Sequence, residues 1–177
     1  MPSIAELIAK HCDADAAAEV SRAAQDLNAP VDEEGRTLLH IAVAGRAPRT
    51  VAALLEAGVN VNVRDRQGST ALVESCRAGE AGLAGAILQA RDDVDFVGNG
   101  LGETALHWAC QAGLSELSLA LLSRGAPPNA PDVFARTPMH WASQQGLLSV
   151  VQEGVERFGA DCNMRSHGGD TALHWAC

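Results

Sequence analysis

Four histidines recur at a nearly regular spacing, and they are the residues best suited to chemistry: His40, His107, His140 and His174. Imidazole nitrogens are common zinc ligands, and zinc binds them at about 2.0–2.1 Å. Each of these histidines follows a threonine by three residues, so each belongs to a different copy of a repeated phrase. Side chains from copies that are not adjacent cannot reach one ion, and we predict that no metal is bound.

Five cysteines, an odd number without a Cys-x-x-Cys pair, are typical of a reducing compartment. Cys76, Cys110 and Cys177 each follow a repeated threonine by six residues. Stacked helices lie about 8–10 Å apart, whereas a disulfide needs its two Cα atoms within about 7 Å of each other. We therefore expect small buried thiols, not disulfides, at this position.

Catalysis by these residues is not expected. His107 and Cys110 lie three residues apart on one helix, but no group is recognisable that would orient the histidine. The segment Asn99–Gly102 is too short to be a glycine-rich phosphate loop. The sequence therefore predicts no catalytic residue and no cofactor.

The elements that position these residues follow from the repeat itself. One phrase begins with threonine and returns at intervals of 33 or 34 residues: Thr37–Ala42, Thr70–Ser75, Thr104–Ala109, Thr137–Ala142 and Thr171–Ala176. In three copies a glycine follows the threonine by nine residues: Gly79, Gly113 and Gly146. Thr-Pro-Leu-His-x-Ala at this period resembles the ankyrin repeat, and the resemblance covers about residues 32–177.

The resemblance implies an all-α fold, an ankyrin-repeat solenoid of stacked antiparallel helix pairs with β-turn or hairpin-like connections. In the second repeat, Asp65–Thr70 is expected to be a tight turn that starts a helix to about Arg77, and a second helix follows over 81–89. The resemblance also implies that each histidine hydrogen-bonds its threonine and neighbouring backbone. We expect a single domain over 1–177, divided into a capping unit (1–33), four repeats (34–66, 67–100, 101–133 and 134–167) and a partial repeat (168–177).

Departures from the repeat predict local irregularities. Ala135 stands where the other turns have glycine, and a left-handed conformation costs alanine roughly 1 kcal/mol or more, so we expect another turn type. Arg46 takes a glycine position between two helices, and we expect that connection to be distorted. An extra residue within 153–159 predicts a bulged helix end, and another around 96–100 predicts an enlarged third turn.

The two ends of the sequence differ. Residues 1–33 read as a degenerate capping unit, in which two short helices turn five apolar residues inward: Ile4, Leu7 and Ile8 from the first, and Val20 and Ala24 from a second over 13–24. The sequence stops at Cys177, within the first helix of a fifth repeat, so we expect a fragment of a longer protein or a frayed end. An uncovered end also favours weak self-association.

Composition excludes several classes of function. The formal net charge is −9 and no basic stripe is present, so nucleic acid is not an expected partner, because phosphate binding needs clustered Lys and Arg. No apolar run approaches the roughly 18 residues of a membrane span, and the start lacks the basic and apolar regions of a signal peptide. We expect no direct membrane insertion and a cytoplasmic or nuclear location.

A binding surface is the remaining interpretation. The resemblance implies that turn tips and the inner faces of the first helices form a concave groove for partners. The predicted partner-binding residues are Trp108, Trp141, Trp175, Leu101, Phe134, Arg136, Arg66, Gln67, Arg77, Gln111, Gln144 and Gln145. All three tryptophans occupy one position of the repeat, where they either contact a partner or cover the helix beneath them. Both interpretations stay open.

The favoured function is a non-catalytic interaction module that binds another protein or peptide. The phrase Leu-His-Trp-Ala is also similar to the ankyrin segments ahead of the membrane-embedded catalytic domain of protein S-acyltransferases, where the segment recruits substrates. Under that alternative the chemistry lies elsewhere in a longer chain. A downstream Cys-rich Asp-His-His-Cys core would distinguish the two.

Overall fold

Each repeat starts with a hydrogen-bonded turn and a capped helix in the computed structural model, which describes residues 3–10, 12–20 and 26–176. In the second repeat the carboxylate of Asp65 accepts hydrogen bonds from the N–H groups of Gln67 and Ser69, both at 2.9 Å. Thr70 then caps helix α5 (Ala71–Arg77) by accepting from the N–H of Val73. Asp and Thr suit these positions because their short side chains satisfy backbone donors that a turn or helix start leaves open.

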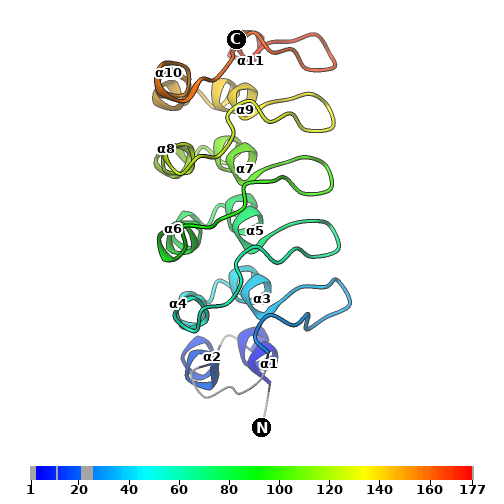
Figure 1. The fold of residues 1–177 in the computed structure, drawn as a ribbon, viewed down its shortest axis with the longest axis vertical. Helices are drawn as coiled ribbons and strands as arrows, with labels where there is room; N and C mark the ends of the chain where they lie inside the picture. Colours follow the sequence, from blue (N-terminus) through cyan, green and yellow to red (C-terminus); the bar gives the residue numbers. More distant parts are fainter. Residues whose placement is uncertain (1–2, 11, 21–25, 177) are drawn as a thin grey trace. The chain divides into compact units, whose positions relative to one another are not determined.

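The chain forms two compact units, Met1–Asp95 and Phe96–Cys177. The helices of the N-terminal unit are α1 (Ile4–Ala9), α2 (Asp13–Val20), α3 (Leu38–Ala44), α4 (Pro48–Glu56), α5 and α6 (Ala81–Ala90). Within this unit the first helices α1, α3 and α5 pack in one row, and the second helices α2, α4 and α6 pack in another (Figure 1).

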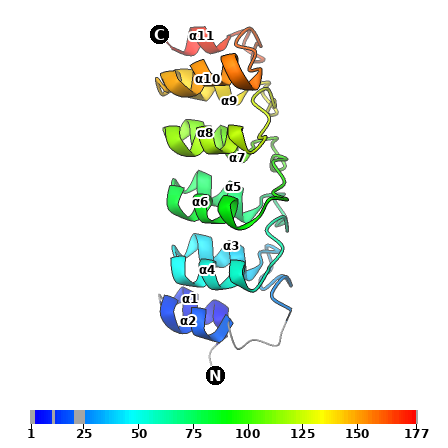
Figure 2. The same cartoon turned by 60° about the vertical axis from the view of Figure 1, so that its left-hand side comes forward.

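The C-terminal unit repeats the same arrangement. Its helices are α7 (Ala105–Gln111), α8 (Ser115–Ser123), α9 (Pro138–Gln144), α10 (Leu148–Phe158) and α11 (Ala172–Trp175). The first helices α7, α9 and α11 pack in order, and α8 packs against α10 (Figure 2). The described residues form helices and turns without a strand, so the predicted all-α fold of helix pairs is confirmed. The single domain and its repeat boundaries stay predictions.

Buried aliphatic side chains recur at matching positions of each layer. Leu72 and Ile87 are almost inaccessible in the N-terminal unit, and Leu106, Leu121 and Met139 are fully buried in the C-terminal unit. The first helices α3, α5, α7 and α9 each bury a Leu or Met two residues after the threonine. No helix in the described part of the chain is both long and apolar enough to cross a membrane.

The predicted capping unit has the expected inward face where it is described. Ile4, Ile8 and Val20 are buried, and Leu7 is half-buried. Ala24 lies outside the described residues. The structure fixes this unit to the first repeat through burial of these side chains and through one carboxylate.

That carboxylate, Asp13 at the start of α2, caps a different helix. Its oxygens accept hydrogen bonds from the N–H groups of Arg49 and Thr50 at 3.0 and 2.7 Å, and from the Thr50 hydroxyl at 2.7 Å. Residue Ala47 precedes α4 and has no side-chain acceptor, so Asp13 supplies the missing cap. Burial opposes ionisation of Asp13, but these hydrogen bonds and the charge of Arg49 together lower its pKa.

The prediction for Ala135 is wrong, because this residue adopts the left-handed conformation with φ +58°. Its N–H donates to the carbonyl of Asp132 at 2.9 Å, as the N–H of Gly68 does to Asp65. The buried Asp132 carboxylate also accepts from the N–H groups of Phe134 and Arg136. These bonds fix the turn and offset the roughly 1 kcal/mol cost of alanine.

The prediction for Arg46 is also wrong. Arg46 has φ +52° and its N–H donates to the carbonyl of Val43 at 3.0 Å, which matches the bond from Gly79 to Cys76. Its guanidinium forms an ion pair with Glu80 at 2.9 Å. The connection therefore keeps the geometry of the glycine-containing copies, although its left-handed residue is an arginine.

The two extra residues are accommodated differently from the prediction. The third turn is not enlarged, because Asn99 N–H reaches the Glu103 carbonyl at 3.0 Å, like the equivalent bond of the second turn. The added residue precedes this turn, where a Cβ on Gly98 would meet the backbone of Gly102 at 2.4 Å. In the fourth repeat the helix α10 lengthens to 11 residues and ends at left-handed Gly159 instead of bulging.

Candidate functional site

The histidines are structural links between layers. Nδ1 of His107 faces the hydroxyl and the N–H of Thr104 at 2.9 and 3.1 Å, and Nε2 faces the carbonyl of Arg136 in the next layer at 3.0 Å. A carbonyl only accepts, so Nε2 carries a proton, and the Thr104 N–H donates to Nδ1, so Nδ1 carries none and the ring is neutral. His40 and His140 make the same contacts with their threonines and with the next layer. The hydrogen bonding that the resemblance implied is therefore confirmed for these three.

Burial also decides the chemistry of the cysteine position. Cys76 and Cys110 are fully buried, as predicted, and Cys177 lies outside the described residues. Burial raises the pKa of Cys110 to about 12, with a small opposing effect of the Ser118 hydroxyl. A thiol with such a pKa is not a nucleophile at neutral pH. No group of three or more His, Cys, Asp or Glu within the described ranges is placed to hold a metal ion.

Aromatic rings and an arginine contact one another on the surface of the C-terminal unit. We define the aromatic cluster as Phe134, Arg136, Trp141 and Trp175. The guanidinium of Arg136 lies 4.6 Å from the ring centre of Phe134 and 4.9 Å from that of Trp141. Trp141 and Trp175 meet edge to face at 5.2 Å. The cluster thus joins one turn to the first helices α9 and α11.

Two carboxylates hold Arg136 in this position. Its Nε donates to Asp132 at 2.6 Å, and the side chain of Asp132 is fully buried. Its Nη2 lies 3.8 Å from Glu103 of the preceding turn. Arg136 is therefore pre-organised between two aromatic rings, with its charge partly neutralised, and its exposed edge faces solvent.

Apolar side chains extend this surface along the turn tips. Leu101, Val133 and Phe134 are 51%, 46% and 54% exposed. Adjacent turns are joined through their backbones, because Val133 N–H donates to the carbonyl of Leu101, and His167 N–H donates to that of Phe134, both at 2.9 Å. The tips therefore form a continuous row that presents apolar side chains to solvent.

An open hollow of about 280 Å³ lies beside the cluster, lined by Phe134, Arg136, Ser166, His167, Gly168 and Trp175. Sequence reasoning did not place Ser166, His167 and Gly168 among the binding residues. Their position at the tip of the last turn was the available signal. They extend the surface because the row of turn tips continues from Phe134 to His167.

The other predicted residues of the C-terminal unit lie around this surface. Trp108 is half-buried, and its indole N–H is buried without a hydrogen-bond partner. The ring contacts described above join Trp141 to Trp175 and do not include Trp108. Gln144 and Gln145 are exposed at the end of α9, and Gln111 is half-buried at the end of α7.

The predicted partner-binding residues of the N-terminal unit are polar or charged, in contrast to the apolar side chains at the turn tips of the C-terminal unit. Arg66 and Gln67 are exposed at a turn tip, and Arg66 N–H donates to the carbonyl of Glu34 in the preceding turn at 2.9 Å. Arg77 forms an ion pair with Glu74, which takes the repeat position that holds tryptophan in the C-terminal unit. Polar and charged groups therefore replace the apolar row here.

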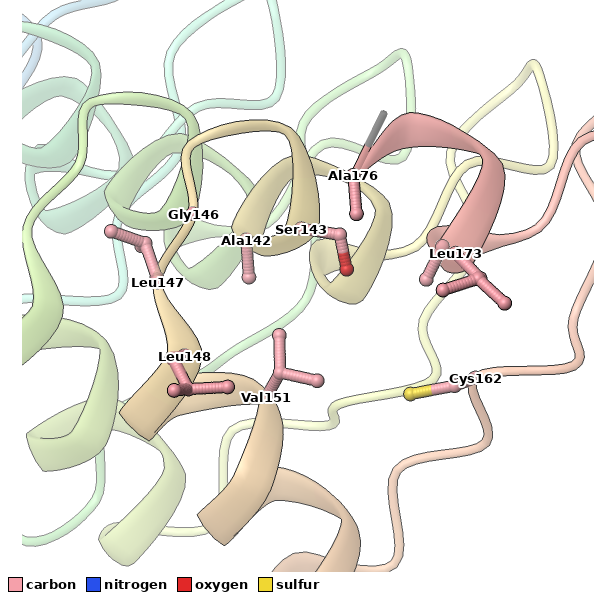
Figure 3. A pocket seen from close by; sticks show the side chains of 10 residues that line it. Ala142, Ser143, Gly146, Leu147, Leu148, Val151, Cys162, Leu173 and Ala176 are labelled. Atoms are coloured by element: carbon pink, nitrogen blue, oxygen red, sulfur yellow. The ribbon is translucent and has the colours of Figure 1, made fainter.

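A second pocket, of about 290 Å³, lies on α9, α10 and α11 of the C-terminal unit (Figure 3). Its lining is almost entirely apolar: Ala142, Ser143, Gly146, Leu147, Leu148, Val151, Cys162, Ala172, Leu173 and Ala176. Leu148 and Leu173 are 75% and 74% exposed. The sequence analysis predicted weak self-association through this end of the chain but named none of these residues, and the self-association stays a prediction.

The chain is a helical repeat protein. Each layer has a pair of helices and a turn, and histidines link one layer to the next. Comparison with known families then places the chain. It matches the description "Ankyrin repeats (3 copies)" over residues 3–97 and 39–132, and "Ankyrin repeat" over residues 136–167. The chain belongs to the ankyrin repeat family, as the sequence analysis predicted.

Curated relatives share this repeat region. The chain is 36% identical over 145 residues to the B-cell lymphoma 3 protein homolog of Mus musculus. The matched region covers 80% of this chain and 32% of that protein. It is 35% identical over 121 residues to the neurogenic locus notch homolog protein 2 of Homo sapiens, covering 68% of this chain and 5% of that protein. The chain thus spans a third or less of the length of these relatives. Ankyrin repeats are protein–protein interaction modules, which supports a binding role.

Proposed function

We propose that the C-terminal unit is a non-catalytic docking surface for another protein, which binds along the turn tips and the aromatic cluster. The observation that carries this proposal is the row of half-exposed apolar side chains Leu101, Val133 and Phe134, beside the pre-organised Arg136. Isolated exposed apolar residues are common on any protein, but a continuous apolar surface with aromatic anchors is typical of an interface.

Phe134 is the expected anchor of this interface. A phenylalanine side chain buries roughly 150–250 Å² in a core, and Phe134 is 54% exposed, so a partner would cover about 100 Å² of it. At about 25 cal/mol per Å² this corresponds to about 2.5 kcal/mol before ordering costs. Replacement by alanine is therefore expected to weaken binding at least tenfold.

Charge adds a preference about the partner. The protein has a formal net charge of −9, and Glu103 and Asp132 accompany the single cation of the cluster. A partner segment with apolar side chains and flanking Lys or Arg suits this surface. Association with such a segment becomes slower at high salt, because screening weakens electrostatic steering.

The test is site-specific photo-crosslinking followed by affinity measurement. A benzophenone amino acid placed at Phe134 should capture the partner in cells, whereas the same group at Val155, which is 47% exposed on α10, should not. The captured protein is then purified, and its dissociation constant is measured with Phe134→Ala and with Val155→Ala. Equal affinities for the two variants would refute the proposed surface.

Trp141 distinguishes the two interpretations of the tryptophan position. Its ring contacts both Arg136 and Trp175, so Trp141→Leu removes packing as well as exposed surface. If the groove role holds, the variant stays folded and binds the partner about tenfold more weakly. If the covering role holds, the melting temperature falls and the residual folded protein binds normally. The alternative of a substrate-recruiting segment in an S-acyltransferase-like chain stays a prediction.

A further inference from the structure

We infer that Asn99, at the start of the third turn (Asn99–Glu103), is a site of deamidation, a reaction with water that converts its amide to a carboxylate and adds a negative charge beside Glu103. The sequence holds a single Asn-Gly pair, Asn99-Gly100. Glycine leaves the asparagine before it most open to this reaction, because no Cβ hinders attack by the glycine nitrogen. The inference rests on this turn and does not depend on the proposed function.

The reaction consumes water and releases ammonia. The backbone nitrogen of Gly100 attacks Cγ of Asn99 and forms a new C–N bond, and the side-chain amide group leaves with the Gly100 amide proton as ammonia. The product is a cyclic succinimide. Water then opens this ring at one of its two carbonyl carbons, which leaves either aspartate or isoaspartate in the chain, and the acid proton passes to ammonia. No electrons are transferred, so the step needs no oxidant or reductant.

The folded turn already supports the first step. Oδ1 of Asn99 accepts hydrogen bonds from the N–H groups of Leu101 and Glu103 at 2.9 and 3.0 Å. Negative charge develops on this oxygen when Cγ is attacked, and two backbone donors directed at it stabilise that charge, as in an oxyanion hole. Asn99 is half-buried and Gly100 is exposed, so water reaches the succinimide.

Two other turns show what a carboxylate at this position requires. They have an aspartate there and an arginine four residues later, joined at 2.6 Å in each case: Asp32–Arg36 and Asp132–Arg136. The third turn has the reverse pair, in which Nδ2 of Asn99 donates to Oε2 of Glu103 at 3.1 Å. An aspartate in place of Asn99 would keep both backbone bonds but would face a second carboxylate.

The new charge therefore acts on Glu103. The side chain of Glu103 is only 16% exposed, so solvent screens the repulsion between the two carboxylates poorly. Its other oxygen, Oε1, lies 3.8 Å from Nη2 of Arg136 in the next turn. Deamidation is expected to weaken the third turn and to move Glu103 toward this guanidinium.

The first experiment follows the amide in the full 177-residue protein during incubation at pH 8 in water enriched in heavy oxygen. Peptide mapping by mass spectrometry should find aspartate and isoaspartate at Asn99, both carrying the heavy-oxygen label. Asn129 is the internal control, because its amide is also hydrogen-bonded through both atoms, but Ala130 follows it. Asn129 should stay an amide.

Gly100→Ala is the matched variant, because Arg66 and Val133 show that the equivalent position of other turns accepts a side chain. It should slow the conversion of Asn99 by about tenfold or more. Equal conversion of Asn99 and Asn129, or equal rates with and without Gly100→Ala, would overturn the inference.

The second experiment tests the consequence with Asn99→Asp, which copies the aspartate product. In urea this variant should raise the equilibrium constant for unfolding about tenfold, because a repelling pair replaces a hydrogen bond. Glu103→Gln supplies a donor again, so adding it to Asn99→Asp should restore most of the loss, measured against Glu103→Gln alone. The same loss with either residue at position 103 would refute the interaction with Glu103.

Discussion

Acid should destabilise the C-terminal unit through His107. This residue is 2% exposed, and burial lowers the pKa of His107 from 6.5 to about 4. Its two ring nitrogens are already committed, because Nε2–H donates to a carbonyl and Nδ1 accepts from Thr104. A second proton on Nδ1 would replace the acceptor with a donor that faces the Thr104 N–H. The imidazolium therefore loses both hydration and a hydrogen bond.

The sign and size follow from the two pKa values. The unfolded chain binds the proton below about pH 6.5, whereas the folded chain binds it only near pH 4. The contribution of the neutral ring is fully present above about pH 6.5 and is lost as the pH falls toward 4. One pKa unit corresponds to about 1.4 kcal/mol, so the loss is about 2 kcal/mol at pH 5 and about 3 kcal/mol at pH 4.

Urea unfolding followed by tryptophan fluorescence measures this loss, since all three tryptophans lie in the C-terminal unit. The variant His107→Val copies the residue that the second repeat carries at Val73 and removes the titrating ring. Its free energy of unfolding is lower at pH 7, but its change between pH 7 and 5 should be smaller than that of the unmodified protein by about 2 kcal/mol. An equal pH dependence in both proteins would refute the reasoning.

Three other outcomes are expected. Asp132→Asn should lower the free energy of unfolding by about 2 kcal/mol, because the amide no longer pairs with Arg136 Nε; a change below 0.5 kcal/mol in urea unfolding would contradict this. Gly98→Ala should cost about 2 kcal/mol or more, since the added Cβ would lie 2.4 Å from the Gly102 backbone, and thermal unfolding measures it. Iodoacetamide at pH 8 should leave Cys110 unmodified in the folded protein and alkylate it in urea, as mass spectrometry can resolve, because burial raises its pKa to about 12.

The sequence predicted the fold because its local signals and its long-range pattern agree. Thr70 and Asp65 each satisfy nearby backbone donors, and the period of the repeat sets which helices pack together. The errors at Ala135 and Arg46 share one cause. Both turns were predicted from the conformational preference of the one residue, whereas contacts with neighbours also decide its backbone conformation. For Ala135 these contacts come from the Asp132 carboxylate, which accepts from the next backbone N–H groups of the turn. For Arg46 they are the N–H bond to Val43 and the ion pair with Glu80.

The candidate surface was predictable in part. Phe134, Arg136 and Trp141 were identified from their positions in the repeat, but the stacking of the Arg136 guanidinium on two rings depends on side-chain conformations that no pattern encodes. The sequence analysis expected an uncovered C-terminal end but did not identify the pocket that Leu173 lines, because a Leu or Met at that position is buried in the four earlier repeats. Only its exposed fraction marks it as different.

The carboxylate of Asp13 belongs in effect to two layers, because it lies in α2 and completes the first turn of α4. The start of α4 is therefore not self-sufficient: without α2, two backbone donors and the buried hydroxyl of Thr50 lose their acceptor. A shortened chain that begins at the first full repeat would carry this defect, although every residue of that repeat is present. For this first repeat the natural unit of truncation is thus not the sequence repeat alone but the repeat together with Asp13 of the preceding layer.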